Sequence, residues 1–435
     1  MSAAAQHAQG RLHASERIEV LCDDNSFAPI AAPAGAGVLA GPARVDGRPI
    51  WLFAEDATVA GGALTPADAG QICAVFDAAC RCGAPVVGLI DTAGTRQQDG
   101  LAGLAALGAI QRHQQRAAGV VPRLAVVMGP CLGAGTSLAA LADLRFMVAG
   151  TSGLLLSGAD IAAAVANEIV GPQALGGAAV HAGQTGLADA VFDDEVATLL
   201  QVRHCLGFLP GARPTADPAA RTAPLLQTLV PDDPARSYDI TELLGQIADE
   251  GEFFMLQPGF AANVLCGFAR LDGIAVGVLA NQPAVLGGCL DAKALGKAAR
   301  FVRLCDALAL PLVTFVDTPG FVPGTAEEHG GIVGAAAALL AAMLSGTAAK
   351  LTVVVGKAYG GAYGVMAPKA LGSDVVLAWS GADIALTGGG PSAGPAVARG
   401  GIDAVIAPAE TRPQLCRALA ARTPGVTAAR CLQNS

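Results

Sequence analysis

The sequence predicts an α/β protein made of two similar halves. Short apolar segments rich in β-branched residues alternate with amphipathic helical segments, and several motifs recur in the same order about 226 residues later. A chain of 435 residues is also too long for one ordinary hydrophobic core. We therefore expect two domains, residues 1–212 and 225–435, joined by a Pro- and Ala-rich linker between Gly211 and Pro224.

The clearest repeat is a strand-like segment that ends in Asp-Thr. APVVGLIDTAG, residues Ala84–Gly94, returns as LPLVTFVDTPG in Leu310–Gly320, an offset of 320 − 94 = 226. Three further pairs follow the same order: Gly41–Gly47 with Gly267–Gly273, Gly61-Gly62 with Gly287-Gly288, and, at an offset of 228, Gly133-Ala134 with Gly361-Ala362. Four ordered correspondences indicate an internal duplication.

The first long helix is expected to begin at Pro66. Thr65 can cap it, and proline suits the first helical position because its missing N–H would have no partner there. An apolar stripe at helical spacing runs on until Gly83, which ends the helix; the stripe is formed by Ile72, Val75, Phe76 and Ala79.

The strands are expected where apolar runs lack polar alternation, as in strands buried on both faces. In the first half these runs are Val86–Asp91 and Leu124–Met128, with a helix between them. The second half repeats the plan with a helix at Ala292–Leu308 and strands at Leu312–Asp317 and Leu351–Val355. Alternating strands and helices predict βαβ units and a largely parallel sheet in each half.

Composition excludes several classes of function. A net charge of −9 argues against a nucleic-acid partner, because counterion release needs a basic surface. The apolar runs fall far short of the roughly 20 residues of a membrane helix, and the first residues lack the apolar core of a signal peptide, so we expect a cytoplasmic protein. The 11 cysteines form no C-x-x-C pair, and we expect no metal site.

Both halves place a glycine-rich turn after an apolar strand. The turns read MGPCLGAGTS, Met128–Ser137, and GKAYGGAYG, Gly356–Gly364. A strand that leads through such a turn into a helix presents free backbone N–H groups, which can hold a phosphate or a transient oxyanion such as a thioester enolate. Close packing of helix on strand is the alternative explanation of either turn alone.

At these motifs the sequence resembles the carboxyltransferase (β) subunits of propionyl-CoA, acetyl-CoA and related biotin-dependent acyl-CoA carboxylases. The resemblance extends from about Arg17 to Arg422. The matching stretches are Gly83–Gly100, Asn167–His181, Asn281–Asp291, Phe315–Ile332 and Lys357–Met366. It implies two tandem crotonase-like folds, one in each predicted domain, and assembly into a hexamer in which one subunit's N-terminal half faces another's C-terminal half.

The resemblance also implies a reaction. Carboxybiotin on a partner carrier would give its carboxyl group to the α-carbon of a short acyl-CoA such as acetyl- or propionyl-CoA. The N–H groups of Gly361 and Ala362 would hold the biotin ureido oxygen, and those of Gly133 and Ala134 the thioester enolate. No biotinylation site or ATP-grasp region is recognisable, so a biotin carboxylase and a biotin carboxyl carrier are the expected partners.

Basic side chains are candidates for binding the CoA phosphates. Arg96, Lys297 and Arg300 are chosen for this role, with Arg303, because the last three are spaced for one helix face; a solvated face is the alternative. Gly364 is expected near the acyl group and stands where propionyl-type members often carry Asp. The choice of acyl chain therefore does not carry over.

Other features leave alternatives open. Asp91 and Asp317 end parallel strands, where active sites gather, but capping or turn roles are equally expected, and His181 and His329 are expected to be structural. The chain is shorter than its relatives before Arg17 and between Gly388 and Ile406, which puts oligomer contacts and carrier docking in doubt. A biotin-dependent decarboxylase subunit, which would have a membrane partner, and a non-catalytic scaffold are the competing functions.

Overall fold

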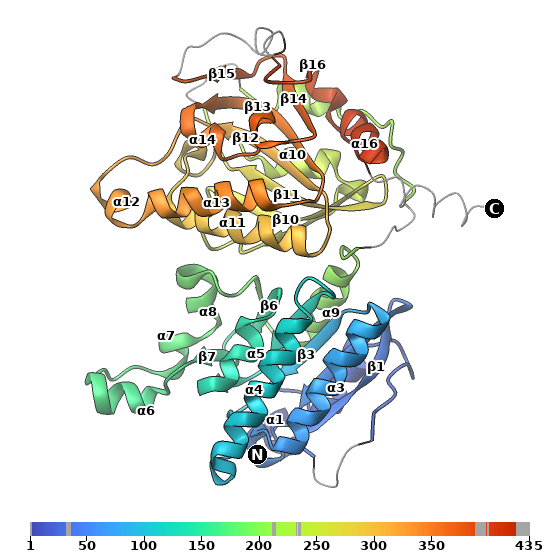
Figure 1. Ribbon diagram of the computed structural model, residues 1–435, viewed down its shortest axis with the longest axis vertical. Coiled ribbons are helices and arrows are strands. Elements are labelled where there is room, and N and C mark those ends of the chain that lie inside the picture. Colours follow the sequence, from blue (N-terminus) through green and yellow to red (C-terminus); the bar gives the residue numbers. More distant parts are fainter. Residues whose placement is uncertain are drawn as a thin grey trace, which may run out of the picture. The chain divides into compact units, whose positions relative to one another are not determined.

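The structure is a computed structural model that describes residues 2–31, 36–210, 215–231, 233, 236–387, 397 and 400–422. The chain folds as two compact units, Met1–Gly207 and Phe208–Ser435, called here the first and second unit (Figure 1). Each unit contains its own sheet. The boundary after Gly207 precedes the expected linker. Pro224–Thr228 forms a 3₁₀ helix of the second unit, with Leu226 buried in its core.

A six-stranded sheet forms the centre of the first unit. Its order is β1 (Val38–Val45), β2 (Arg48–Glu55), β3 (Val86–Ile90), β4 (Arg123–Val127), β6 (Leu144–Val148) and β8 (Ala190–Phe192). β1 and β2 form an antiparallel hairpin, and every later neighbour is parallel. Two short parallel strands, β5 (Pro130–Leu132) and β7 (Gly153–Leu155), form a separate pair. The expected strands at Val86 and Leu124 are confirmed to within one residue.

Helices precede, connect and follow these strands. The main ones are α1 (Ala3–His7), α2 (Ala14–Leu21), α3 (Pro66–Cys82), α4 (Gly100–Arg116), α5 (Thr136–Ala140) and α9 (Glu195–Leu206). The capping prediction for α3 is confirmed: Thr65 accepts the N–H of Asp68, the Asp68 carboxylate accepts the N–H of Thr65, and Gly83 ends the helix with φ 67°. Its apolar stripe packs into the core of the sheet, beside Phe53.

The second unit repeats this plan with one added strand. Its sheet contains β9 (Phe253–Leu256), β10 (Val264–Leu271), β11 (Ile274–Asn281), β12 (Leu312–Thr318), β13 (Lys350–Tyr359), β14 (Val375–Trp379) and β16 (Ala404–Ile406), with β15 (Asp383–Ala385) paired to the end of β13. Its main helices are α10 (Thr241–Ile247), α11 (Ala292–Ala307), α12 (Thr325–His329), α13 (Ile332–Ser345), α14 (Gly360–Gly364) and α16 (Thr411–Arg422). The strand expected at Leu351–Val355 is longer because β15 extends its pairing to Tyr359.

The two units correspond strand for strand. The first hairpin pairs Val38 with Glu55, and the second pairs Val264 with Asn281, the same register at an offset of 226. The two backbone bonds that follow are also equivalent: the Leu64 N–H donates to Gly94 O, and the Leu290 N–H donates to Gly320 O. The predicted tandem duplication is therefore confirmed.

The repeated glycines are explained by close backbone contacts. Gly62 and Gly288 have φ of 75° and 79°, a left-handed conformation that side chains disfavour. A Cβ atom at either position would also collide with a carbonyl oxygen, that of Asp91 in the first unit and that of Asp317 in the second. The glycine just before each, Gly61 or Gly287, faces open space.

Each hairpin turn is held by an aspartate from outside the sheet. The carboxylate of Asp23 accepts the N–H groups of Asp46 and Gly47, at 2.8 Å each. In the second unit the carboxylate of Asp249 accepts the N–H groups of Asp272 and Gly273, at 2.9 and 2.6 Å. The repeat thus includes the segment that precedes each sheet, a correspondence that the sequence alone did not reveal.

Helices pack on opposite faces of the second sheet. One face buries Leu243 of α10 and Leu415 of α16 together with the strand residues Phe315 and Val353. On the other face Phe301 of α11 packs against Phe268 of β10. Among the described residues, no helix is both long and apolar enough to cross a membrane.

Candidate active site

Each glycine turn follows the carboxyl end of a strand and leads into a helix. In the first unit β5 leads through extended Leu132 into the N-terminal turn, Gly133–Gly135, which continues into α5. In the second unit β13 leads through extended Tyr359 into the C-terminal turn, Gly360–Ala362, the start of α14. The predicted arrangement of strand, turn and helix is thus present in both units.

The structure corrects the register between these turns. Gly133 and Gly360 are the left-handed residues, with φ of 59° and 53°, and their offset is 360 − 133 = 227. Burial follows the same register: Ala134 and Gly361 are exposed, whereas the residues after them, Gly135 and Ala362, are buried. The offset of 228 paired Gly133-Ala134 with Gly361-Ala362, and this pairing is wrong. The counterpart of Gly361-Ala362 is Ala134-Gly135.

The backbone N–H groups of these turns are the chemically available donors. The first N–H groups of a helix have no acceptor within the helix, so each turn presents them beyond the end of the sheet. Side chains stabilise the carbonyl groups of the N-terminal turn instead: the Thr136 hydroxyl donates to Gly133 O at 2.7 Å, and the Ser137 hydroxyl donates to Ala134 O at 2.8 Å. These two bonds fix the turn without using its N–H groups.

Asp91, at the end of β3, is part of a buried ion-pair cluster. Its carboxylate accepts hydrogen bonds from Arg11 and from Arg17, the latter at 2.9 Å, and Arg17 also donates to Glu195 at 2.7 and 2.9 Å. All four side chains are at most 6% exposed. Paired charges of this kind are structural, so the structure favours the non-catalytic role that the sequence left open.

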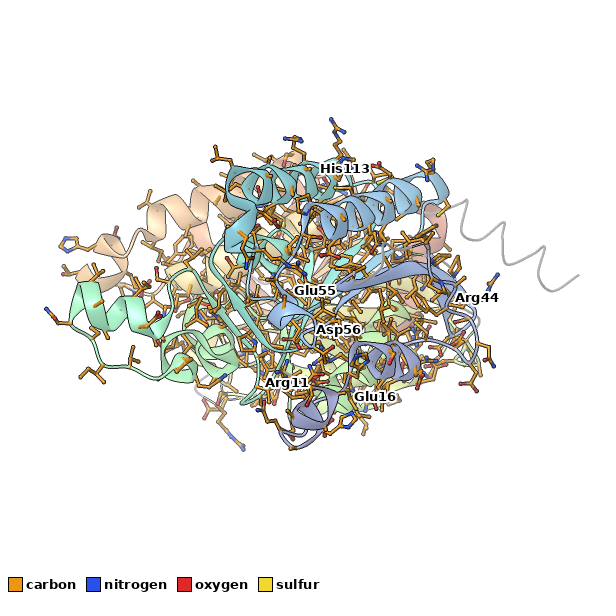
Figure 2. All side chains as sticks on the ribbon, turned by 90° about the horizontal axis from the view of Figure 1, so that it is seen from below. Arg11, Glu16, Arg44, Glu55, Asp56 and His113 are labelled. Atoms are coloured by element: carbon orange, nitrogen blue, oxygen red, sulfur yellow. The ribbon has the colours of Figure 1, made fainter. Side chains whose placement is uncertain are left out.

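Glu55 lies next to this cluster, of which Arg11 is labelled in Figure 2, but its carboxyl group has a different electrostatic environment. Its side chain is fully buried and accepts the backbone N–H of Asp91 at 2.8 Å. Burial away from water, together with the nearby negative charge of Asp91, raises the pKa of Glu55 to about 8. Asn281, its counterpart at an offset of 226, accepts the N–H of Asp317 with a neutral amide. A protonated Glu55, like the amide of Asn281, accepts a backbone N–H without carrying a charge.

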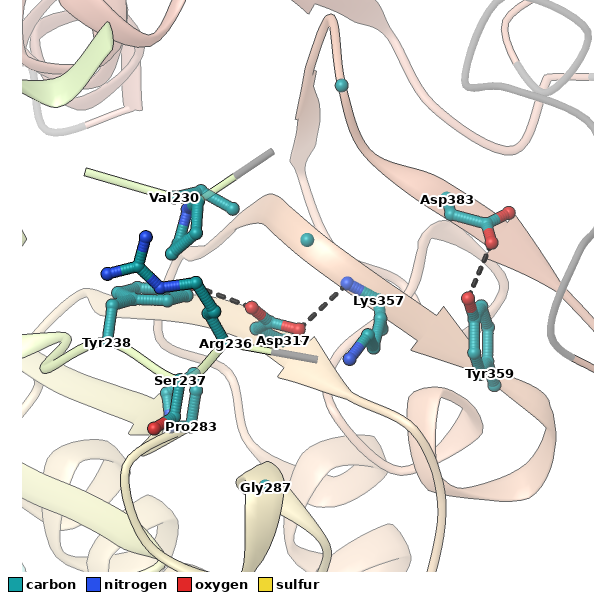
Figure 3. Close-up of a pocket in the computed structure, with 13 residues that line it drawn as sticks. Val230, Arg236, Ser237, Tyr238, Pro283, Gly287, Asp317, Lys357, Tyr359 and Asp383 are labelled. Atoms are coloured by element: carbon teal, nitrogen blue, oxygen red, sulfur yellow. Dashed lines mark hydrogen bonds between the residues drawn. The ribbon is translucent and has the colours of Figure 1, made fainter. Parts of the chain in front are cut away.

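Asp317 occupies the equivalent position in the second unit without an arginine partner among the described contacts. It accepts the Tyr238 hydroxyl and the Lys357 backbone N–H, both at 2.8 Å (Figure 3). Burial raises the pKa of Asp317, although these two hydrogen bonds oppose the effect. The carboxylate borders a pocket of about 310 Å³, which Arg236, Lys357 and Asp383 also line.

Lys297 does not take the position that its predicted role requires. Its side chain is 3% exposed, and its ammonium donates to the carbonyl oxygens of Gln257 at 3.0 Å and Phe260 at 2.8 Å. Burial lowers the pKa of Lys297. The side chain thus anchors the loop before β10 and cannot reach a CoA phosphate. Arg300 is half-buried and Arg303 exposed, so the three residues do not form one solvent face.

The other predicted substrate-binding residues are accessible. Arg96 is half-buried beside the N-terminal end of α4, and its backbone N–H donates to Leu64 O. Gly364 is half-buried and ends α14, three residues after Gly361. Of the histidines, His181 contacts Leu154 O at 2.9 Å and Thr185 Oγ1 at 3.0 Å, a structural role as expected, and His329 is exposed at the end of α12.

Sequence reasoning missed a pair of side chains beside the C-terminal turn. The hydroxyl of Tyr359, the residue before Gly360, donates to Asp383 of β15 at 2.5 Å. The other carboxylate oxygen of Asp383 is buried and has no partner among the described residues. The bond fixes the entry into the turn. Only its place beside the repeated turn motif could have pointed to Tyr359, and nothing in the sequence pointed to Asp383.

No metal site is evident in the part of the chain that the structure describes, where no three His, Cys, Asp or Glu side chains gather around a common point. Residues 388–396, within the stretch expected to be shortened, lie outside the described residues.

Comparison with known proteins decides the family. A model of the carboxyl transferase domain matches residues 5–395. The chain belongs to the carboxyl transferase domain family. It is 44% identical over 406 residues to the propionyl-CoA carboxylase beta chain of Cereibacter sphaeroides, a match that covers 88% of this chain and 80% of that protein. This carboxyltransferase is also 38% identical over 461 residues to the methylmalonyl-CoA decarboxylase subunit alpha of Veillonella parvula, covering 95% and 91%.

A solved structure supports the tandem crotonase-like fold of this carboxyltransferase. The crystal structure of transcarboxylase 12S, described as a hexamer with hydrolysed methylmalonyl-coenzyme A bound, superposes with a TM-score of 0.92 at 33% identity. The match covers 96% of this chain and 90% of that one.

Proposed function

We propose that this carboxyltransferase moves a carboxyl group from carboxybiotin, carried by a partner chain, to the α-carbon of an acyl-CoA. The observation that carries the proposal is the duplicated turn, which gives one chain two sets of free N–H donors, one for each reactant. Relatives named propionyl-CoA carboxylase beta chains support the choice of an acyl-CoA substrate.

The C-terminal turn suits the ureido oxygen of biotin. Gly361 is exposed, so a ligand oxygen can approach its N–H group from the solvent side, and the N–H group of the buried Ala362 follows directly. Two donors fixed before the reaction stabilise developing negative charge without reorganising, an effect of several kcal/mol in a dry site. Carboxybiotin supplies the activated carboxyl group when its carrier docks; the protein holds the oxygen.

The N-terminal turn would hold the oxygen of the thioester enolate. The sequence assigned this role to Gly133 and Ala134, and the corrected register extends the assignment to Gly135, the counterpart of Ala362. Positioning and electrostatics are the contribution of the protein, since the nearby Asp91 is committed to arginines and offers no free base. Gly364 remains a candidate contact of the acyl group.

Arg96 and Arg300, each in its own unit, remain the candidates for binding the CoA phosphates. Both guanidinium side chains are partly accessible, and arginine forms paired hydrogen bonds with phosphate oxygens. Lys297 is withdrawn from this role because its ammonium is buried among carbonyl groups. A charge-reversal variant of Arg96 that loses carboxyl transfer to acyl-CoA, but retains carboxyl transfer to a thioester without CoA, would identify a binding role.

We further propose that a biotin carboxylase and a biotin carboxyl carrier are the partners, and that the chain self-associates into a hexamer or another homo-oligomer. Support comes from the relatives' names and from the hexamer described for transcarboxylase 12S. Decarboxylation is the second candidate, because the match to the methylmalonyl-CoA decarboxylase subunit is nearly as extensive. Both directions pass through the same enolate, so the same turns would serve either.

The test exchanges single N–H donors. Ala362→Pro removes a donor in the first helical turn, where proline disturbs no intrahelical bond, and should lower transfer about 10²- to 10³-fold while acyl-CoA binding is retained. Ala134→Pro should instead suppress exchange of the α-proton of the acyl-CoA. The matched controls Ala362→Gly and Ala134→Gly keep the N–H and should stay near wild type. Near-wild-type transfer in both proline variants, with normal circular dichroism and oligomer mass, would contradict the assignment.

A further inference from the structure

We propose that the acyl-CoA substrate carries a chain longer than propionyl, and that this chain lies in an apolar pocket of the first unit. The inference rests on the proposed function and names the substrate class more closely. The pocket has a volume of about 480 Å³ and is called here the leucine pocket. Its apolar lining includes Leu154, Leu155, Leu156, Leu175, Leu187 and Ala140.

The leucine pocket lies next to the N-terminal turn, although the three residues of the turn do not line it. Thr136, which follows Gly135 directly, lines it, and so does Ala140, one helical turn further along α5. Residues four apart lie on one face of a helix, so the pocket runs along α5 away from the turn. A thioester whose oxygen rests on the N–H groups of that turn therefore has hydrocarbon walls beside its acyl chain.

The walls offer a ligand few polar groups, of which the hydroxyl of the exposed Ser157 is one. The Thr136 hydroxyl is bonded to Gly133 O, and both ring nitrogens of His181 have partners, Leu154 O and Thr185 Oγ1. Leu154 and Leu155 are 6% and 5% exposed and belong to β7, so this wall is firm. A polar ligand would lose its hydration with little compensation here, whereas an alkyl chain would gain by leaving water.

The leucine pocket is larger than a two- or three-carbon acyl group. A volume of about 480 Å³ falls in the range of sites that enclose whole small molecules. An acetyl or propionyl group would leave most of it unfilled. Leu156, at the rim, is 81% exposed, and a longer chain that follows the pocket outward would cover this leucine as well.

The experiment measures dissociation constants of acetyl-, propionyl-, butyryl-, hexanoyl- and octanoyl-CoA on the full chain without carboxybiotin, and then kcat/KM for transfer to each. We expect affinity to rise about fourfold for each added methylene up to hexanoyl or octanoyl, the gain of burying one CH₂ group. Ala140→Phe, which fills the leucine pocket, should lower the affinity for octanoyl-CoA relative to that for acetyl-CoA at least tenfold. Leu175→Trp is a second filling variant should the first not fold.

Ala105→Phe is the matched control, since Ala105 is exposed on α4 and does not line the leucine pocket. It should leave the chain-length profile unchanged. Affinity that falls beyond propionyl, while transfer to propionyl-CoA proceeds, would overturn the pocket assignment and spare the proposed function. Length-dependent binding without transfer to any thioester would do the reverse. Filling variants that change the oligomer mass but not the length profile would show that a second copy covers the pocket.

Discussion

Asp91 and Asp317 end equivalent strands, yet their surroundings have little in common. Asp91 is neutralised by Arg11 and Arg17, while Asp317 receives a phenol and a backbone N–H and borders an open pocket. The backbone requirement is shared: a Cβ at Gly129 in the first unit or at Gly356 in the second would collide with the carboxylate. Duplication has thus preserved the backbone around these carboxylates and left their charge compensation free to diverge.

The strongest test of the shared backbone replaces Gly62 or Gly288 by alanine. We expect either variant to prevent folding of its own unit, because the Cβ would collide with the following strand's carbonyl oxygen and the left-handed φ disfavours it as well. Hydrogen exchange read separately for residues of each unit would locate the loss. Gly61→Ala and Gly287→Ala, which face open space at similar φ, should cost only about 1 kcal/mol. If the alanine variants of Gly61 and Gly287 lost as much stability as those of Gly62 and Gly288, the collision with the carbonyl oxygen would not explain the repeated glycines.

The next effect concerns buried arginines. Arg17→Met leaves Asp91 and Glu195 buried with one cation fewer, which should lower the free energy of unfolding by about 3–5 kcal/mol. Arg412→Met should cost a similar amount in the second unit, where this fully buried arginine pairs with Asp249 at 2.7 Å. Arg203→Met removes two partly exposed ion pairs, with Asp23 and with Asp46, and should cost at most about 1 kcal/mol in chemical denaturation. A small loss at Arg17 would show that its carboxylates find other partners.

Glu55 and Asn281 differ in a way that pH can expose. The folded-state pKa of Glu55 is raised to about 8, so the unfolded chain loses this proton first, and stability falls as pH rises from its ordinary pKa through the folded one. Between pH 6 and 8 the wild type should lose at most about 3 kcal/mol relative to Glu55→Gln, at about 1.4 kcal/mol per unit. Denaturant titrations across this range measure the difference. Asn281→Asp should create a dependence of the same sign, and parallel wild-type and Glu55→Gln curves would contradict the protonated glutamate.

The smallest effect tests the contact that replaces arginine in the second unit. Tyr238→Phe removes the hydroxyl that donates to Asp317 and should cost about 1–3 kcal/mol, with a further rise in the pKa of Asp317. A double-mutant cycle with Asp317→Asn isolates the pair. Additive losses would mean that the 2.8 Å bond contributes nothing of its own.

Local sequence signals predicted several of the helices and strands but not the side-chain environments. Thr65, Pro66 and Gly83 delimit α3 because capping and proline effects act within a few residues. The partners of Asp91 come from residues 74 and 80 positions away, which no local pattern reveals. Helical spacing likewise placed Lys297 on one face of α11 but could not show that the loop through Gln257 and Phe260 covers that face.

The local structure of the two glycine turns was predicted, whereas the pairing between them was wrong by one residue; the roles assigned to them stay predictions. Strand, turn and helix followed from the motifs, whereas the offset between the turns is 227 because the second unit has one more residue between Asp317 and Gly356 than the first has between Asp91 and Gly129. Matching by letters paired Gly133 with Gly361. The φ angles pair it with Gly360.

The aspartates that hold the two hairpin turns, Asp23 and Asp249, each belong to the same unit as the hairpin they bind. Each half therefore carries the carboxylate that stabilises its own hairpin, and neither half needs the other for this contact. The junction after Gly207 is accordingly the place where the coding sequence could be divided into two genes. Complementation by the two mixed polypeptides would then show whether each half folds without a covalent link to the other.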